Sequence, residues 1–437
     1  MNPTPDSPNR TRRAILGTTG SLGLAALAGC MGGSEPEASG DDEEMNNEGM
    51  EDEEMDEEME PETEGAAPPA DDVPILNYAL TLEHLENAFY REGLETFSDD
   101  ELMEADVLSS FDERLRMAVP DYLRTVGAHE AAHVDALTAT VKDLNGTPLG
   151  EGEYDFGYET PSEFLGVAQA LENTGVAAYA GAAPMVVSND VLSAAAGIHS
   201  VEARHASFLN LVNGDSPFPN GVDEAQSVEE VLEIAGQFVT SAVDPSAYEL
   251  DDDRGTQERK ADNDTSDVDV LNYALTLEHL ENAFYREGLE TFSDEELMDA
   301  EVLSGFSDDL LMMVPDHIET VGAHEAAHVE ALTATVEQFG GDPVGEASYD
   351  FGYETPSEFF GVAQALENTG VAAYAGAAPT VSNDDVFDAA IGIHSVEARH
   401  AAFLNELNAE SPFPDGVDES MTMDEVVEVA SQFIVEE

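Results

Sequence analysis

The stretch LRTVGAHEAAHVDALTATVKDL, residues 123–144, decides the fold. Its apolar residues recur in alternating steps of three and four, which is the period of the buried face of an α-helix. Two positions on that face carry Glu130 and His133 in place of apolar side chains. Because buried charge costs free energy unless it is compensated, the stretch predicts a helical bundle with a polar site inside it.

A second stretch repeats the pattern. Residues 191–212 carry an apolar stripe that is interrupted by Glu202 and His205. Both stretches therefore place a Glu-x-x-His pair on an inward face. Side chains three residues apart lie on the same side of a helix, so each pair can reach one ion.

Two further predicted helices carry a single inward glutamate each. Glu83 and Glu172 both precede a tyrosine by seven residues, Tyr90 and Tyr179. We expect these tyrosines either to hydrogen-bond near the site or to pack in the core. Glu86 lies one turn beyond Glu83 and is an alternative candidate on that helix.

Four inward carboxylates repel one another, and no Lys or Arg stands at the facing stripe positions to pair with them. Isolated buried charges of one sign are prohibitively costly. A pair of divalent or trivalent metal ions would compensate them. Carboxylate oxygens together with imidazole nitrogens suit iron or manganese better than metals that prefer softer ligands.

The whole pattern occurs twice, with an offset of 195 residues. Residues 76–99 recur unchanged at 271–294. We predict two tandem domains, 73–243 and 267–437, joined by an acidic linker, 244–266. The second domain repeats the candidate residues as Glu278, Glu325, His328, Glu367, Glu397, His400, Tyr285 and Tyr374.

Helix signals place the long helices of the first domain after Asp72, near Pro120, at Thr160 and after Ser188. Thr160 opens a capping box in which Glu163 is the partner. A short fifth helix is predicted after Ser227. No strand pattern competes, so the fold class is all-α.

The connection from Asn145 to Thr160 is unusually long for a bundle. Its sixteen residues span about 50 Å when extended, whereas a helix of about 20 residues is about 30 Å long. The connection is therefore long enough to cross the whole bundle between the second and third long helices.

This order of elements resembles the ferritin-like di-iron carboxylate bundles, and more narrowly the exported ferritin-like domain family that includes desiccation-related proteins. The resemblance covers nearly all of both domains. It implies one di-iron centre per repeat, with manganese or a mixed Mn/Fe centre as alternatives. It implies these ligands: Glu83, Glu130, His133, Glu172, Glu202 and His205 in the first repeat, and Glu278, Glu325, His328, Glu367, Glu397 and His400 in the second.

The resemblance also implies a role for each ligand. Glutamates of the first and third long helices are typically terminal ligands. Those of the Glu-x-x-His pairs typically bridge the two metals, and each histidine binds one of them.

A competing motif overlaps the first Glu-x-x-His pair. His-Glu-Ala-Ala-His, from His129 to His133, matches the zinc-protease pattern, in which both histidines bind zinc and Glu130 is the general base. Against this reading, His129 lies off the apolar stripe. We expect the histidines beside ligand positions to face solvent: His84, His129 and His199.

Three functions fit such a chain. The first is redox chemistry in which ferrous ions are oxidised by O2 or peroxide. The second is a non-enzymatic module that metal ions stabilise. The third is a surface interaction module with a vestigial site. Storage in a hollow shell does not suit a tethered tandem chain, and no Cys-x-x-Cys is present to hold a rubredoxin-type iron.

The charge of the chain excludes one class of partner. Lys and Arg number 14 against 95 Asp and Glu in 437 residues, a net charge of -81. Nucleic acids require cationic surfaces, so we expect no nucleic-acid binding. Such composition resembles proteins of salt-loving archaea, in which salt screens the self-repulsion.

The first 30 residues read as an export signal. Paired arginines in residues 10–17 precede a short apolar stretch, which indicates the twin-arginine route. The stretch ends Leu-Ala-Gly-Cys at Cys30, which resembles a lipobox and predicts a lipid anchor on the outer face of the cytoplasmic membrane. Cys30 is the only cysteine, so no intrachain disulfide is possible. Residues 31–72 are acidic and are expected to form a disordered spacer.

Overall fold

The computed structural model describes residues 72–241 and 266–435. Both ranges belong to one compact unit, Gly65–Glu437. The predicted export signal, Cys30, nearly all of the acidic spacer and nearly all of the linker lie outside the described residues.

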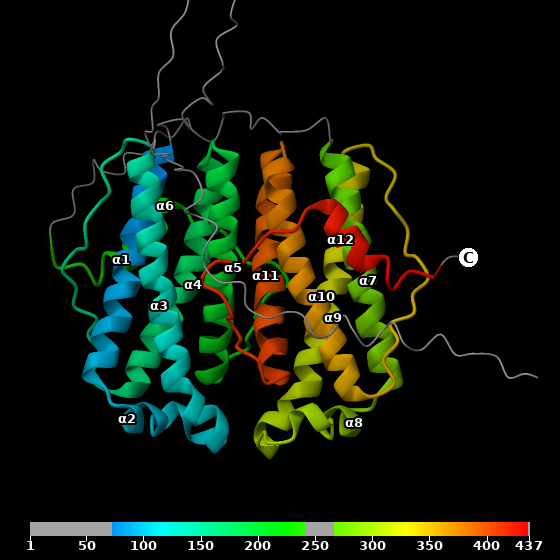
Figure 1. Ribbon diagram of the computed structural model, residues 1–437, viewed down its shortest axis with the longest axis horizontal. Helices are drawn as coiled ribbons and strands as arrows, with labels where there is room; N and C mark the ends of the chain where they lie inside the picture. Colours follow the sequence, from blue (N-terminus) through cyan, green and yellow to red (C-terminus); the bar gives the residue numbers. More distant parts are fainter. Residues whose placement is uncertain (1–71, 242–265, 436–437) are drawn as a thin grey trace, which may run out of the picture. The chain divides into compact units, whose positions relative to one another are not determined.

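Within the described ranges the chain is helical, with isolated β-bridges and no strand, so the predicted all-α class is confirmed. Four long helices build the first repeat: α1 (Val73–Thr96), α3 (Glu113–Asp143), α4 (Pro161–Ala182) and α5 (Asn189–Val212). Shorter helices accompany them: α2 (Asp99–Met103), η3 (Asp106–Ser110), η4 (Ala183–Met185) and α6 (Val228–Ala235). α1 packs against α3 and α4, and α4 packs against α5 (Figure 1).

The second repeat has the same order. Its long helices are α7 (Asp267–Thr291), α9 (Asp308–Gln338), α10 (Pro356–Ala377) and α11 (Asp384–Leu407). Its short helices are α8 (Asp294–Met298), η7 (Glu301–Leu303), η8 (Ala378–Thr380) and α12 (Met423–Ala430). None of the helices in the described part of the chain combines the length and the apolarity needed to cross a membrane.

One predicted helix start, that of α3, differs from the structure. α3 begins at Glu113, seven residues before Pro120, because the Asp112 side chain caps it by accepting the N–H of Leu115 at 2.7 Å. An interior proline costs about 3 kcal/mol. The apolar stripe continues across Pro120 through the buried Leu115 and Val119, and this burial offsets the cost.

Asp72 does stand at the N-cap of α1, but its side chain does not cap that helix. Its two carboxylate oxygens instead accept the N–H groups of Val187 and Ser188, at 2.8 and 3.0 Å. The contact ties the start of α1 to the start of α5. The predicted capping boxes at Thr160 and Ser227 are confirmed, with Glu163 and Glu230 as their partners.

The long connection between α3 and α4 lies along α1. His84 of α1 is buried beneath it, with Nε2 3.1 Å from the carbonyl oxygen of Leu149. The prediction that His84 faces solvent is therefore wrong, because this connection covers that side of the helix. Farther along, Tyr154 forms an antiparallel bridge with Val239, after α6.

The two repeats meet through α5 and α11, which pack side by side (Figure 1). His199 of α5 is buried there, with Nδ1 3.4 Å from Nδ1 of His394 in α11. The expectation that His199 faces solvent is wrong because that face of the helix is the contact between the repeats.

Candidate metal centre

The six predicted ligands of the first repeat come together in the interior. They form two groups in which one possible ligand atom per residue lies within 4.8 Å of all the others. The first group is Glu83, Glu130, His133 and Glu202, and the second is Glu130, Glu172, Glu202 and His205. All six side chains are buried.

Glu130 and Glu202 belong to both groups. Each comes from a Glu-x-x-His pair, one on α3 and one on α5. Glu83 and Glu172, from α1 and α4, belong to one group each. We call these two groups the first and second poles of the site. The poles share two carboxylates, as a pair of ions with bridging ligands requires.

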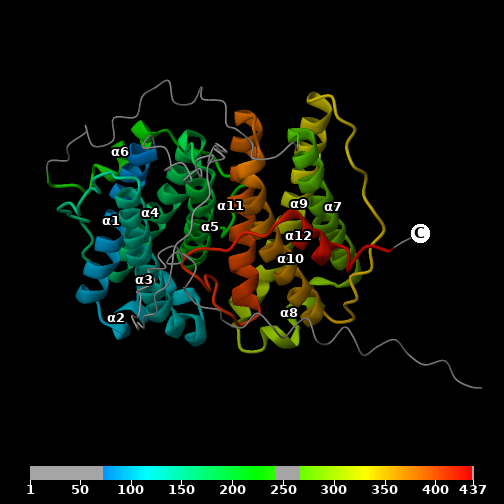
Figure 2. The same ribbon diagram turned by 45° about the horizontal axis from the view of Figure 1, so that its top comes forward.

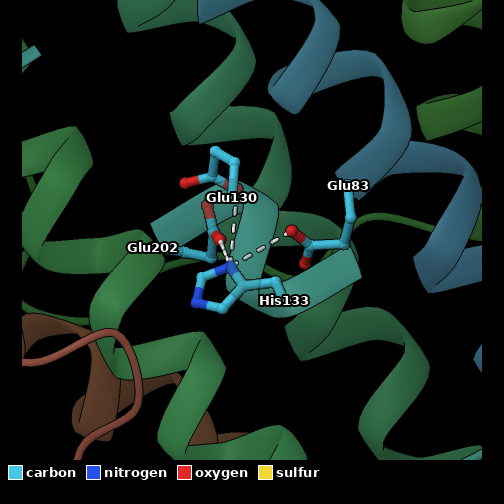
Figure 3. A group of neighbouring side chains, drawn as sticks. All are labelled: Glu83, Glu130, His133 and Glu202. Carbon is cyan, nitrogen blue, oxygen red and sulfur yellow. Dashed lines mark hydrogen bonds and ion pairs between the residues drawn. The ribbon is translucent and has the colours of Figure 1, made fainter. Parts of the chain in front are cut away.

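At the first pole, three carboxylates face the Nδ1 atom of His133 (Figure 3). This atom lies 3.1 Å from Glu83 Oε2, 3.2 Å from Glu202 Oε1 and 3.4 Å from Glu130 Oε2. The opposite ring atom, Nε2, lies 2.6 Å from the carbonyl oxygen of Gly416, in the second repeat. Because Nε2 donates to that carbonyl, Nδ1 is the ring nitrogen that a cation between the carboxylates would bind.

The second pole is built in the same way. The Nδ1 atom of His205 lies 3.1 Å from both Glu130 Oε1 and Glu172 Oε2. Its Nε2 atom lies 3.1 Å from Nδ1 of His129. Each histidine thus directs Nδ1 toward the carboxylates and anchors its ring through Nε2.

Two tyrosines fix the outer glutamates. The hydroxyl of Tyr179 donates to Glu83 Oε1, and that of Tyr90 donates to Glu172 Oε1. The other oxygen of each glutamate faces a histidine. Each outer glutamate therefore has one oxygen held by tyrosine and one directed into the site, which suits a terminal ligand.

The shared glutamates have no such partners. All four carboxylate oxygens of Glu130 and Glu202 are buried without a hydrogen bond. Their contacts with the histidines are close, but they lack hydrogen-bond geometry. Buried oxygens without a partner are costly, and cations between the two groups would satisfy them. The residues therefore fit a di-metal centre.

The pKa shifts of the ligand glutamates also indicate a site that needs cations. Burial is the largest single influence on the pKa of Glu130 and raises it, but His133 and His205 together outweigh burial and hold the pKa below its ordinary value. Burial and the charge of Glu130 raise the pKa of Glu202 well above its ordinary value. Burial raises the pKa of Glu83 to about 7 despite the opposing charge of His133. Without cations, therefore, the cluster retains protons in their place.

A fifth carboxyl lies beside the first-repeat cluster. Glu86 is buried, and burial together with the charge of Glu202 raises its pKa well above its ordinary value. A Cβ atom at Gly175 would lie 3.1 Å from Glu86 Oε1 and 3.0 Å from Glu202 Oε2, so glycine leaves room for both side chains. Of these two candidates on α1, Glu83 belongs to a group of possible ligand atoms, whereas none of the groups found among the described residues contains Glu86.

The zinc-protease arrangement does not form. His133 belongs to a ligand group, but none of the groups found among the described residues contains His129. His129 is only half-buried, and its ring stacks on His205 with centroids 5.3 Å apart, so it faces solvent on one side only. Burial and the nearby charge of His205 lower the pKa of His129 to about 3.

The second repeat reproduces the geometry, with two groups that share Glu325 and Glu397. His328 Nδ1 lies 3.1 Å from Glu278 Oε2, and His400 Nδ1 lies 3.1 Å from Glu367 Oε2. The corresponding tyrosines repeat the donation: Tyr374 donates to Glu278, and Tyr285 donates to Glu367.

The sequence gives no sign of one set of contacts, those made by the opposite repeat. The carbonyl oxygen of Gly221 lies 2.6 Å from His328 Nε2, as that of Gly416 does from His133 Nε2. A backbone carbonyl leaves no pattern of residue types, so only the tertiary structure reveals this contact.

Comparison with known proteins agrees with this geometry. The ferritin-like domain family matches residues 71–215 and 266–410, which together are more than half of the chain. No curated protein matches the chain. Each matched range contains one complete set of converging glutamates and histidines. The chain belongs to the ferritin-like domain family and carries two copies of the domain in tandem.

Proposed function

We propose that each repeat binds two iron or manganese ions and that the preferred reaction is oxidation of ferrous ions by peroxide or O2. The observation that carries the proposal is the sharing of Glu130 and Glu202 between two groups of ligand atoms. Mixed oxygen and imidazole ligands favour these metals. The expected benefit to the cell is removal of oxidants and of reactive ferrous iron.

The chemistry that two bound ferrous ions supply is one electron each, so that one peroxide is reduced to two hydroxides while both ions become ferric. The protein holds the ligand carboxylates in position. Glu83 and Glu172 are held by tyrosine hydroxyls, so they need little reorganisation when ions bind. Glu130 and Glu202, whose oxygens have no hydrogen bond, are available to both ions.

Burial of the site contributes as well. The ligand side chains of both repeats are fully or almost fully enclosed by the helices. Exclusion of bulk water strengthens electrostatic interactions within the site and limits leakage of reactive products.

Metal analysis combined with stopped-flow kinetics tests the proposal. Anaerobically loaded wild type is expected to hold about four ions per chain and to oxidise Fe(II) faster than buffer does. Glu130→Ala should lose the ions of the first repeat, and the matched Glu325→Ala those of the second. The double variant should lose both sets and all catalysed oxidation. Unchanged metal content in the double variant would defeat the assignment.

A non-enzymatic role is the second candidate, and the unpaired buried oxygens favour it. Ions that satisfy these oxygens stabilise the folded state whether or not they turn over. Metal-dependent melting without oxidation above the buffer rate would select this role over the redox one.

We also propose that the protein is exported and lipid-anchored through Cys30, on the strength of the sequence motif alone. Membrane fractionation of cells that express the wild type and the Cys30→Ser variant tests this. The variant is expected to leave the membrane fraction, and retention there would contradict the anchor.

A further inference from the structure

The segment that follows the fourth long helix of each repeat crosses to the other repeat. After α11, residues 410–421 run beside α5 before the chain enters α12 (Figure 2). Residues 215–226, between α5 and α6, make the reciprocal contacts with the second repeat. We call these two stretches the exchanged segments.

Each exchanged segment reaches a metal-facing histidine of the opposite repeat. The carbonyl oxygen of Gly416 accepts from His133 Nε2, and that of Gly221 accepts from His328 Nε2, both at 2.6 Å. Such a bond fixes which ring nitrogen carries the proton and how the ring is turned. In a single repeat, Nε2 would lose this acceptor.

A buried ion pair secures each segment. Asp418 accepts from Arg204 Nε at 2.7 Å, and its own N–H donates to the carbonyl oxygen of Gly197 at 3.1 Å. Arg204 is 2% exposed. A Cβ atom at Gly197 would lie 2.6 Å from the carbonyl oxygen of Asp418, so the close approach requires glycine.

The reciprocal contacts are equivalent. Asp223 accepts from Arg399 Nε at 2.7 Å and donates its N–H to the carbonyl oxygen of Gly392 at 3.1 Å. The two repeats thus exchange the same set of bonds in both directions. This reciprocity is the pattern of an isologous dimer interface, here within one chain.

An exchanged phenylalanine closes each site. The ring of Phe413 lies edge-on to His205 with centroids 5.1 Å apart, and Phe218 lies in the same way 5.0 Å from His400. Both phenylalanines are fully buried, and each joins the hydrophobic core of the opposite repeat. Each phenylalanine therefore contacts a metal-facing histidine that belongs to the other repeat.

We propose that both metal centres are composite: helices of one repeat supply the ligands, and the exchanged segment of the other repeat positions the histidines. The inference rests on the proposed metal binding. It follows that metal affinity at one centre depends on residues of the opposite repeat. Asp418 and Phe413 are thus positioning residues for the first centre, and Asp223 and Phe218 for the second.

The test isolates one centre in the full-length chain. In the background Glu325→Gln/Glu397→Gln, only the first centre can bind Mn(II), which equilibrium dialysis measures. Adding Asp418→Asn is expected to weaken binding by about 10- to 100-fold, the range seen for groups that orient metal ligands. The matched Asp223→Asn, made in the same background, should leave affinity unchanged.

The opposite background, Glu130→Gln/Glu202→Gln, should reverse the result, so that Asp223→Asn weakens binding and Asp418→Asn does not. Phe413→Ala and Phe218→Ala provide a second pair with the same expected pattern if an aspartate variant fails to fold, as judged by circular dichroism. Equal effects of the paired variants, or no effect of either, would overturn the composite centre. Absence of Mn(II) and Fe(II) binding in the wild type would instead refute the proposed function.

Discussion

The Nδ1 atom of His133 lies 3.1 Å from Glu83 Oε2, although the two residues are 50 positions apart and belong to different helices. The Glu-x-x-His spacing brings His133 to Glu130, but only the packing of α1 on α3 brings it to Glu83. This cross-helix pair defines one pole of the centre. It also leads to a test that separates the two glutamate candidates of α1.

Glu83→Gln and Glu86→Gln are expected to differ in how strongly they weaken metal binding. Glu83 offers an oxygen to the converging group, so its amide variant should weaken metal binding in the first repeat by at least about 10-fold. Burial raises the pKa of Glu86 well above its ordinary value and so favours its neutral form, which glutamine closely matches. Metal titration with both variants makes the comparison. A larger loss for Glu86→Gln would assign the ligand role to Glu86.

A buried tyrosine hydroxyl should contribute to the unfolding free energy only where it has a hydrogen-bond partner. Tyr179→Phe leaves Glu83 Oε1 buried without its donor, so we expect about 1–3 kcal/mol lower unfolding free energy in the metal-free protein. Tyr78 is the matched control, because its buried hydroxyl has no hydrogen-bond partner. Tyr78→Phe should be neutral or stabilising. Urea unfolding measures both, and equal losses would argue against a special role for the Tyr179–Glu83 bond.

The metal-free protein should become less stable as pH rises from about 5 to 9. Burial raises the pKa of Glu83 from 4.5 to about 7. Burial tends to lower the pKa of His205, but Glu172 and Glu130 together outweigh burial and raise the pKa from 6.5 to about 9. Both groups bind protons more tightly in the folded state, so their contribution is lost as pH rises through these windows.

Bound metal should reverse the trend, because ligands must be deprotonated to bind cations. Thermal unfolding at pH 5, 7 and 9, with EDTA or with saturating Mn(II), checks both parts. Stabilisation by Mn(II) should be largest at pH 9. A metal-free melting temperature that rises steadily from pH 5 to pH 9 would contradict the inferred proton retention.

Two glycines of α4 should respond oppositely to alanine. A Cβ atom at Gly181 would lie 1.9 Å from the carbonyl oxygen of Gln226, whereas one at Gly166 would meet nothing within 4 Å. Gly181→Ala should cost about 1–3 kcal/mol of unfolding free energy through overpacking. Gly166→Ala should gain up to about 1 kcal/mol through helix propensity. Chemical denaturation tests the pair, and a neutral Gly181→Ala would argue against this close approach.

The predicted helices were accurate where a local signal defines them. The start of α5 after Ser188 and the capping boxes of α4 and α6 were predicted correctly from neighbouring residues. The predicted start of α3 is wrong, because Pro120, although typical of a first helical turn, lies inside this helix. Burial of Leu115 and Val119, which depends on distant parts of the chain, allows the helix to pass through it. The short helix α2 was missed.

The sequence by itself determined the all-α class, the duplication and the set of glutamates and histidines that converge, because helical periodicity assigns each side chain to a face. Tertiary structure alone decided which faces meet. It buried His84 beneath the α3–α4 connection, paired His199 with His394 and placed Gly416 over His133. These contacts join segments far apart in sequence, and no periodic pattern records which distant surface will cover a given face.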